Sequence, residues 1–276
     1  MFKQVVVGVD GEVGGRDAIA LARQLVDIDG ELTLANVWSP DGPELLKRER
    51  AAARITAHLR TVDGDSVGGA LHELADDELA DLLVVGSSRR GLVDRVFLGG
   101  VTRAALHDAR CPVAVAPSGY ARRPHPIRSI GVGYNGSPEC DQALAAARRL
   151  AAETDATLSV FEVISMAPRD SMSDFYNSRF AIQRAVRKTE ERLGKLGGVE
   201  PHAVYGTPAE ELALYSNSVD LLVVGSRSHG PFGRLLLGST SVSLVRSVRC
   251  PLLVLTRAAG HAGLGFDQPV IQGVAH

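Results

Sequence analysis

The feature that most constrains the fold is an internal repeat, because one stretch of sequence occurs twice in the chain. Residues 81–116 and 220–255 align without a gap over 36 positions, of which 15 are identical. The identities include all of DLLVVGS and the triplet RCP. The two copies also begin alike, with VGVDG at residues 7–11 and VGYNG at residues 132–136. Self-similarity of this extent predicts two homologous domains.

The join between the copies is rich in proline. Residues 117–126 contain three prolines, one glycine and several basic side chains. Proline fixes φ and removes a backbone donor, so we expect a linker without helix or strand. The end of the chain is Gly-rich and lacks periodicity, so we expect it to be loosely ordered. The predicted domains are 1–117 and 127–257, with the linker at 118–126 and a flexible tail at 258–276.

Short apolar runs alternate with helical patterns in both copies, which is typical of parallel strands buried on both faces. Predicted strands cover residues 4–9, 31–37, 55–62, 82–85 and 112–116, and again 129–134, 157–164, 201–205, 221–224 and 251–255. Predicted helices cover residues 14–26, 43–53 and 68–77, then 138–153, 173–196 and 208–216, and a last helix in each copy ends near residues 107 and 246. This order predicts an α/β fold of two tandem, doubly wound, Rossmann-like domains, each with a five-stranded parallel sheet.

The fifth predicted strand is apolar on both faces in each copy, at residues 113–115 and 252–255. If the strand order is the usual one for this fold, the fifth strand lies at a sheet edge, where an apolar strand is an aggregation hazard. We therefore expect the two fifth strands to cover each other, so that the domains pair about a pseudo-two-fold axis.

Ligands of doubly wound sheets bind outside the carboxyl ends of the strands, where the winding reverses. The candidate residues at the ends of strands one, two and four are Asp10, Val37 and Gly86 in the first copy and Asn135, Val163 and Gly225 in the second.

A Gly- and Ser-rich loop follows the fourth strand in each copy and leads into a helix. Glycines let backbone N–H groups approach a ligand, and a helix N-terminus favours phosphate. The further candidates for phosphate binding are Ser88, Arg89, Gly99, Gly100 and Thr102 in the first copy and Arg227, Ser228, Gly238, Ser239 and Ser241 in the second. The same residue types also suit an ordinary turn and a helix cap, so this pattern alone leaves ligand binding open.

In combination, these motifs resemble the universal stress protein family in its tandem two-domain form. The matching features are DLLVVGS, the Gly-rich loop, LGG or LGS before a helix, and RCPV or RCPL. The resemblance implies five-stranded parallel α/β domains that pair through the fifth strand. It also implies ATP binding in the branch with a Gly-x2-Gly-x9-Gly-Ser/Thr pattern, and no ATP binding in the branch that lacks it.

Both copies depart from that pattern while keeping its spacing. Copy two has Ser228 in place of the second Gly, and copy one has Arg89 there and Gly100 in place of Ser/Thr. We therefore expect ATP, with or without Mg²⁺, in the second domain, and leave the first domain open. The resemblance also implies that Asp10 contacts the nucleoside, that Asn135 is its uncharged counterpart, and that adenine meets backbone groups at Val37 and Val163.

Composition and motifs exclude several other classes. The 30 basic and 32 acidic side chains balance, which argues against binding of nucleic acid or of an anionic membrane. The three cysteines form no disulfide framework, and we expect a reduced, soluble, cytoplasmic protein. The loops lack the Lys-Ser/Thr of a P-loop, and neither a catalytic residue nor a metal-ligand spacing is evident.

These observations predict an ATP-binding regulatory protein of the stress response that is not an enzyme. One alternative is the same fold without nucleotide, acting through protein contacts. Another is an enzyme of the adenylyl-transfer or pyrophosphatase kind, which would need a metal-binding acid or a HIGH-like or SGGxDS loop. The expected partners are an adenine nucleotide and an unidentified regulatory protein, and homodimer formation stays open.

Overall fold

The computed structural model of the chain describes residues 1–87, 100–106, 109–165, 175–226 and 239–255. Six of the candidate loop residues and the predicted tail at 258–276 lie outside these ranges. The six residues are Ser88, Arg89, Gly99, Arg227, Ser228 and Gly238.

The first half of the chain alternates strands and helices as the sequence predicts. Its elements are β1 (Phe2–Gly8), α1 (Val13–Leu25), β2 (Val26–Val37), α2 (Gly42–Ala53), β3 (His58–Val62), α3 (Val67–Asp77), β4 (Leu82–Gly86), α4 (Gly100–Leu106) and β5 (Val113–Ala116). Strand β2 begins earlier than expected, because Val26 already pairs with Phe2 and a bulge separates this pair from the regular ladder.

The second half repeats the order, with one longer helix. Its elements are β6 (Ser129–Gly133), α5 (Pro138–Thr154), β7 (Thr157–Ile164), α6 (Phe175–Gly194), β8 (Glu200–Tyr205), α7 (Pro208–Tyr215), β9 (Leu221–Gly225), α8 (Ser239–Ser247) and β10 (Leu252–Leu255). Helix α6 has 20 residues where α2 has 12, which accounts for much of the extra length of the second copy.

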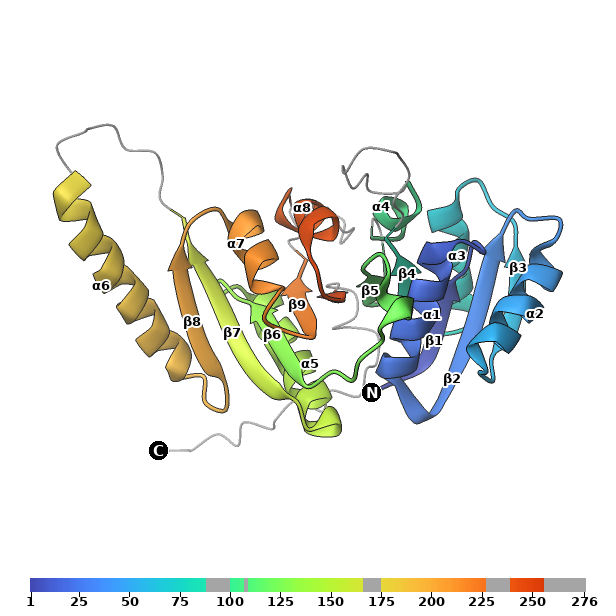
Figure 1. The fold of residues 1–276 in the computed structure, drawn as a ribbon, viewed down its shortest axis with the longest axis horizontal. Coiled ribbons are helices and arrows are strands. Elements are labelled where there is room, and N and C mark those ends of the chain that lie inside the picture. The colour runs from blue at the N-terminus through green and yellow to red at the C-terminus, as the bar shows by residue number, and fades with distance from the viewer. Residues whose placement is uncertain (88–99, 107–108, 166–174, 227–238, 256–276) are drawn as a thin grey trace, which may run out of the picture.

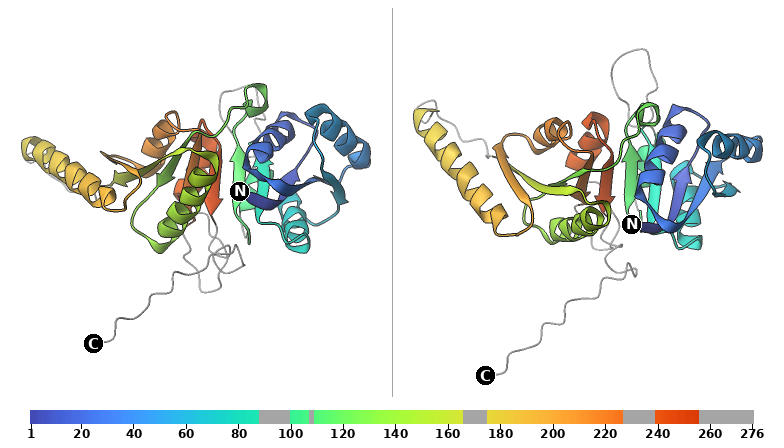
Figure 2. Two further views of the ribbon diagram at one scale, coloured as in Figure 1. Left: turned by 90° about the horizontal axis from the view of Figure 1, so that it is seen from below. Right: turned by 60° about the horizontal axis from the view of Figure 1, so that its bottom comes forward.

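The ten strands of the described residues form one continuous sheet, in the order β3-β2-β1-β4-β5-β10-β9-β6-β7-β8 (Figure 1). Neighbouring strands within each half are parallel, and only the central pair, β5 and β10, is antiparallel. In that pair Ala114 lies opposite Leu253. The predicted fold class and the predicted pairing of the fifth strands are therefore confirmed, and Figure 2 shows the two halves side by side.

The core lies on both faces of the sheet. One apolar cluster packs the sheet against α1, α2, α5 and α6, and a second packs it against α3, α4, α7 and α8. Successive residues of β4 and β9 point to opposite faces, so their uninterrupted apolar runs fill both clusters. Within the described part of the chain, no helix combines the length and the apolarity that a membrane crossing requires.

The aspartate that begins each DLLVVGS motif stabilises the sheet. The Asp81 carboxylate accepts hydrogen bonds from the backbone N–H groups of Lys3 (2.8 Å) and Gln4 (3.0 Å). In the second half, Asp220 accepts in the same way from Arg128 and Ser129, both at 2.9 Å. Each carboxylate thus satisfies donors at the start of the neighbouring first strand, which explains why the repeat begins with this residue.

The sequence predicts no helix in the proline-rich segment between β5 and β6. This prediction is wrong, because Tyr120–Arg122 form one turn of 3₁₀-helix. The turn is held by the buried carboxylate of Asp17 in α1, which accepts hydrogen bonds from the N–H groups of Gly119 and Ala121 at 2.7 Å each. Prolines 117 and 124 flank the turn and do not interrupt it. The segment is therefore attached to the first half of the molecule.

Candidate functional site

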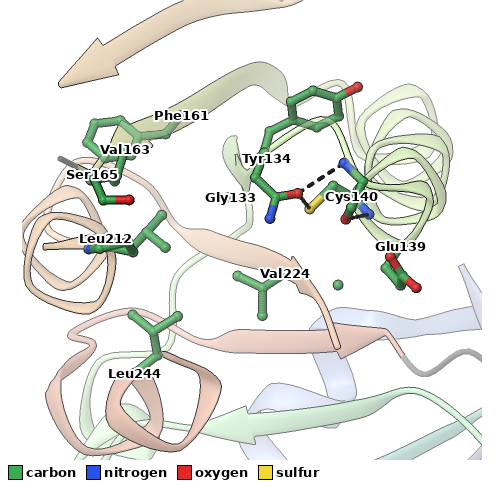
Figure 3. A pocket seen from close by; sticks show the side chains of 14 residues that line it. Gly133, Tyr134, Glu139, Cys140, Phe161, Val163, Ser165, Leu212, Val224 and Leu244 are labelled. Atoms are coloured by element: carbon green, nitrogen blue, oxygen red, sulfur yellow. Dashed lines mark hydrogen bonds between the residues drawn. The ribbon is translucent and has the colours of Figure 1, made fainter. Parts of the chain in front are cut away.

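The winding of each half reverses between its first and fourth strands, that is, between β1 and β4 and between β6 and β9. In the second half a cavity of about 160 Å³ opens at the carboxyl ends of β6, β7 and β9 (Figure 3). It is lined by Gly133, Tyr134, Asn135, Ser137, Glu139, Cys140, Phe161, Val163, Ser165, Pro208, Leu212, Val224, Gly225 and Leu244. The cavity lies where the sequence predicts a ligand site.

Three residues that were predicted separately line this one cavity: Asn135, Val163 and Gly225. Its lining has two chemically different sides. Phe161, Val163 and Leu212 make one side apolar, whereas Cys140 and Glu139 lie on the other side (Figure 3). Asn135 also lines the cavity, and it accepts a hydrogen bond from Cys140. An apolar cavity with a few convergent polar groups is the usual form of a small-molecule site.

The loop after β6 is held by the side chain of Asn135. Its Oδ1 accepts hydrogen bonds from the backbone N–H of Ser137 (3.0 Å) and from the Cys140 thiol (3.2 Å). Gly136 takes a φ of 76°, in the region that favours glycine. Ser137 then caps α5 by accepting from the N–H of Cys140 at 3.4 Å.

Asp10 plays the same part in the first half. Its Oδ1 accepts from the N–H groups of Glu12 (2.9 Å) and Gly15 (3.3 Å), two and five residues further on. In the second half the donors at this spacing are the Ser137 N–H and the Cys140 thiol. Gly11 has the matching φ of 78°. Both side chains therefore organise a strand-to-helix turn, and this role requires no ligand.

The glycines that end β4 and β9 are required by close packing of backbone on backbone. A Cβ atom on Gly86 would lie 2.0 Å from the carbonyl oxygen of Gly14, and one on Gly225 would lie 2.5 Å from that of Glu139. The first turn of α1 or α5 thus lies directly against the end of the strand. Any larger residue would move the helix away from the cavity edge.

The described parts of the helices after the Gly-rich loops run from Gly100 in α4 and from Ser239 in α8, and Ser241 belongs to α8. The side chains of Ser239 and Ser241 lie outside what the structure describes. Thr102 is fully buried, and its hydroxyl donates to the carbonyl oxygen of Gly86 at 2.9 Å. This hydroxyl is thus engaged within the chain.

In the first half, Val37 and Gly86 end β2 and β4, which flank β1, and Asp10 lies two residues beyond the end of β1. Beside them Arg16 of α1 pairs with the buried carboxylate of Glu49 in α2, at 3.0 Å. When VGVDG is aligned with VGYNG, the residue of the second half that corresponds to Arg16 is Asp141. The two crevices therefore differ in charge next to the same turn.

Several lining residues were not singled out from the sequence: Tyr134, Glu139, Cys140, Phe161 and Leu212. The Tyr134 hydroxyl donates to Asp141 at 2.5 Å, and this hydrogen bond is the main reason why the pKa of Tyr134 is raised to about 12. Tyr134 and Cys140 directly flank the predicted turn, which is the one sequence signal that could have identified them. Leu212 comes from α7, which no motif connects with the turn.

Among the described residues, no group of three or more His, Cys, Asp or Glu side chains is placed to hold a metal ion. The described part of the cavity offers hydrogen-bonding groups and one carboxylate, together with apolar surface. These groups can bind and orient a small molecule.

The comparisons with known proteins agree on one family. The sequence profile of the "Universal stress protein family" matches residues 42–117 and 126–256. The universal stress protein Rv2005c of Mycobacterium tuberculosis is 32% identical over 182 residues, which are 63% of this chain. The match spans only 61% of that relative's own length.

A solved structure resembles this chain in fold over both halves. The crystal structure of a universal stress protein from Archaeoglobus fulgidus covers 92% of this chain and 98% of its own, with a TM-score of 0.65 and 20% identity. It shows the fold. A crystal structure of a universal stress protein in complex with cAMP is 27% identical over 42% of this chain and 96% of its own, with a TM-score of 0.36.

Proposed function

Because this chain belongs to the universal stress protein family, we propose that it is a regulatory protein that binds an adenine nucleotide, ATP in particular, in the cavity of its second half. We assign it no catalytic step. The domains of this proposal are residues 1–117 and 127–257, and the second is the binding domain.

The observation that carries the proposal is the convergence of Asn135, Val163 and Gly225 on one cavity. Pockets for complete drug-sized ligands hold roughly 300–1,000 Å³, so the described cavity of about 160 Å³ has room for part of a nucleotide, such as its base. The apolar side at Phe161 and Val163 suits a purine ring. The polar side at Asn135 and Gly225 suits the sugar and the phosphates, in line with the Gly-rich loop that follows Gly225.

Nucleotide binding in this cavity would be communicated to a protein partner through the helices that border it. The cavity is bordered by α5, α7 and α8, and Val224 in β9 also pairs with Val254 in β10, next to the interface between the halves. A ligand that contacts all three helices would favour the conformations in which they pack together. A protein partner that recognises this helical surface would then respond to nucleotide.

The test is a pair of matched substitutions with binding measured by calorimetry. Val163→Trp fills the cavity, so we expect the affinity for ATP to fall at least about tenfold because the base loses its place. Val37→Trp makes the same change at the corresponding strand end of the first half and should leave ATP binding unchanged. Both variants need wild-type circular dichroism and melting behaviour for this comparison.

The expected stoichiometry is one nucleotide per chain. Equal ATP affinity of wild type and Val163→Trp would refute the proposed site. Loss of binding in Val37→Trp alone would move the site to the first half. No binding by the wild-type protein, and no nucleotide released from freshly purified protein, would favour the alternative that the fold acts through protein contacts alone.

A further inference from the structure

Glu139 is the only charged side chain among the described residues that line the cavity. It lies in the first turn of α5 and is partly buried. Figure 3 shows it at the end of the cavity away from Phe161 and Val163. In the first half the corresponding residue is Gly14, so the acid is particular to the second half.

Close packing against Gly225 fixes the position of Glu139. A Cβ atom on Gly225 would lie 3.1 Å from the Cβ of Glu139, so the two residues are in direct contact. Gly225 lines the cavity and belongs to its polar side, to which we assign the sugar and the phosphates. The Glu139 side chain therefore begins beside the sugar-phosphate end of the proposed ligand.

An acid in the first turn of a helix stabilises the helix, and α5 has two, Glu139 and Asp141. Their surroundings differ, however. Asp141 accepts a hydrogen bond from Tyr134, whereas Glu139 borders the cavity, and its carboxylate has no ion-pair partner among the described residues. Helix stabilisation explains an acid in this turn but not its position at the cavity.

We propose that Glu139 makes this site selective for the charge of the nucleotide. The inference rests on the proposed function. A fixed carboxylate beside the phosphates repels them, and the repulsion grows with each negative charge that the ligand carries. The site therefore discriminates against metal-free ATP relative to AMP and adenosine. Mg²⁺ on the phosphates reduces their charge and with it the discrimination.

The test compares wild type with Glu139→Gln, which keeps the shape of the side chain and removes its charge. Adenosine, AMP and ATP are titrated calorimetrically in EDTA, and ATP also with excess Mg²⁺. We expect the variant to bind metal-free ATP about tenfold tighter and AMP about threefold tighter, with adenosine unchanged within about twofold. High salt should reduce the gain for ATP, because it screens the repulsion.

The matched control is Glu210→Gln. Glu210 is an exposed acid in the first turn of α7, a helix that also borders the cavity, but it is not among the lining residues. It should change the ATP affinity by less than about twofold, because its carboxylate lies in high dielectric.

The outcomes separate the two proposals. An unchanged ATP affinity in Glu139→Gln, or an equal change for adenosine and ATP, refutes charge selection but leaves nucleotide binding intact. If neither wild type nor variant binds adenosine, AMP or ATP, the proposed function itself fails and this inference fails with it.

Discussion

At the scale of single residues, the two halves make the same turn with different side chains. Asp10 and Asn135 each accept hydrogen bonds from groups two and five residues ahead, one as a carboxylate and the other as an amide. Gly86 and Gly225 then let α1 and α5, the helices after these turns, lie against the sheet. The residues that build the crevice are thus shared between the halves, whereas those that give it charge, such as Arg16 and Glu139, are not.

Substitution of Gly86 should destabilise the fold. In Gly86→Ala the new methyl group would meet the Gly14 carbonyl oxygen at 2.0 Å, so we expect a loss of about 2 kcal/mol or more in the free energy of unfolding. Gly194→Ala is the control, because its methyl group would have no neighbour closer than 3.9 Å, and helix propensity favours alanine by about 1 kcal/mol. Urea denaturation of both variants measures the difference. Equal stabilities would contradict the close packing.

The three cysteines should differ in reactivity. Burial raises the pKa of the Cys111 and Cys250 thiols to about 12, so both should resist alkylation at pH 8. Cys140 lines the cavity, and we expect iodoacetamide to modify it first and ATP to slow this reaction. Peptide mass spectrometry identifies the modified thiol. Faster labelling of Cys111 or Cys250 than of Cys140 would contradict the expected access to Cys140 through the cavity.

At the scale of elements, helix α1 attaches the 3₁₀ turn after β5 to the first half of the molecule. Its residue Asp17 is buried and binds the 3₁₀ turn that follows β5, through the N–H groups of Gly119 and Ala121. Burial raises the pKa of Asp17 above its usual range, although both hydrogen bonds oppose this shift. The folded state therefore binds this proton more tightly than the unfolded chain does.

That shift predicts a pH dependence of stability. Because the pKa of Asp17 is raised in the folded state, its contribution to the free energy of unfolding falls as the pH rises above about 4, the usual pKa of Asp. Asp17→Asn cannot titrate and offers one acceptor oxygen to two donors, so it should lose about 1–2 kcal/mol. We expect the stability gap between wild type and variant to be larger at pH 4 than at pH 7. Urea denaturation at both values measures it, and a gap that widens with pH would show a lowered pKa.

The sequence predicts nearly every element of the fold, because alternating apolar runs and helical patterns follow from local packing requirements. The 3₁₀ turn at Tyr120–Arg122 could not be predicted, since it depends on Asp17, about a hundred residues earlier in the chain. For the site, motif spacing identifies Asn135, Val163 and Gly225. It does not identify Phe161 or Leu212, because only the packed sheet and α7 bring these side chains to the cavity.

At the scale of the whole molecule, the ten-stranded sheet depends on one antiparallel contact. Strands β5 and β10 are fully buried and would each become an apolar edge if the halves were separated. The edges that remain are β3 and β8, which carry polar residues such as His58, Arg60, Glu200 and His202. The tandem arrangement thus protects the two apolar strands and leaves polar edges outside.

Separated halves should therefore associate. We expect fragments of residues 1–126, which keeps the 3₁₀ turn bound to Asp17, and 127–257, each purified alone, to sediment as dimers or larger species because their fifth strands are uncovered. An equimolar mixture should form a one-to-one complex that restores the β5–β10 pair. Two stable monomers that do not combine would contradict the account of the interface.

The most direct test of nucleotide binding in the second half is a crystal structure of the full chain grown with ATP. The account predicts density for one adenosine per chain, with the base against Val163 and Phe161 and the phosphates leading away past Gly225. Nucleotide density in the first half alone, or a cavity without nucleotide at an ATP concentration that saturates binding in solution, would contradict it.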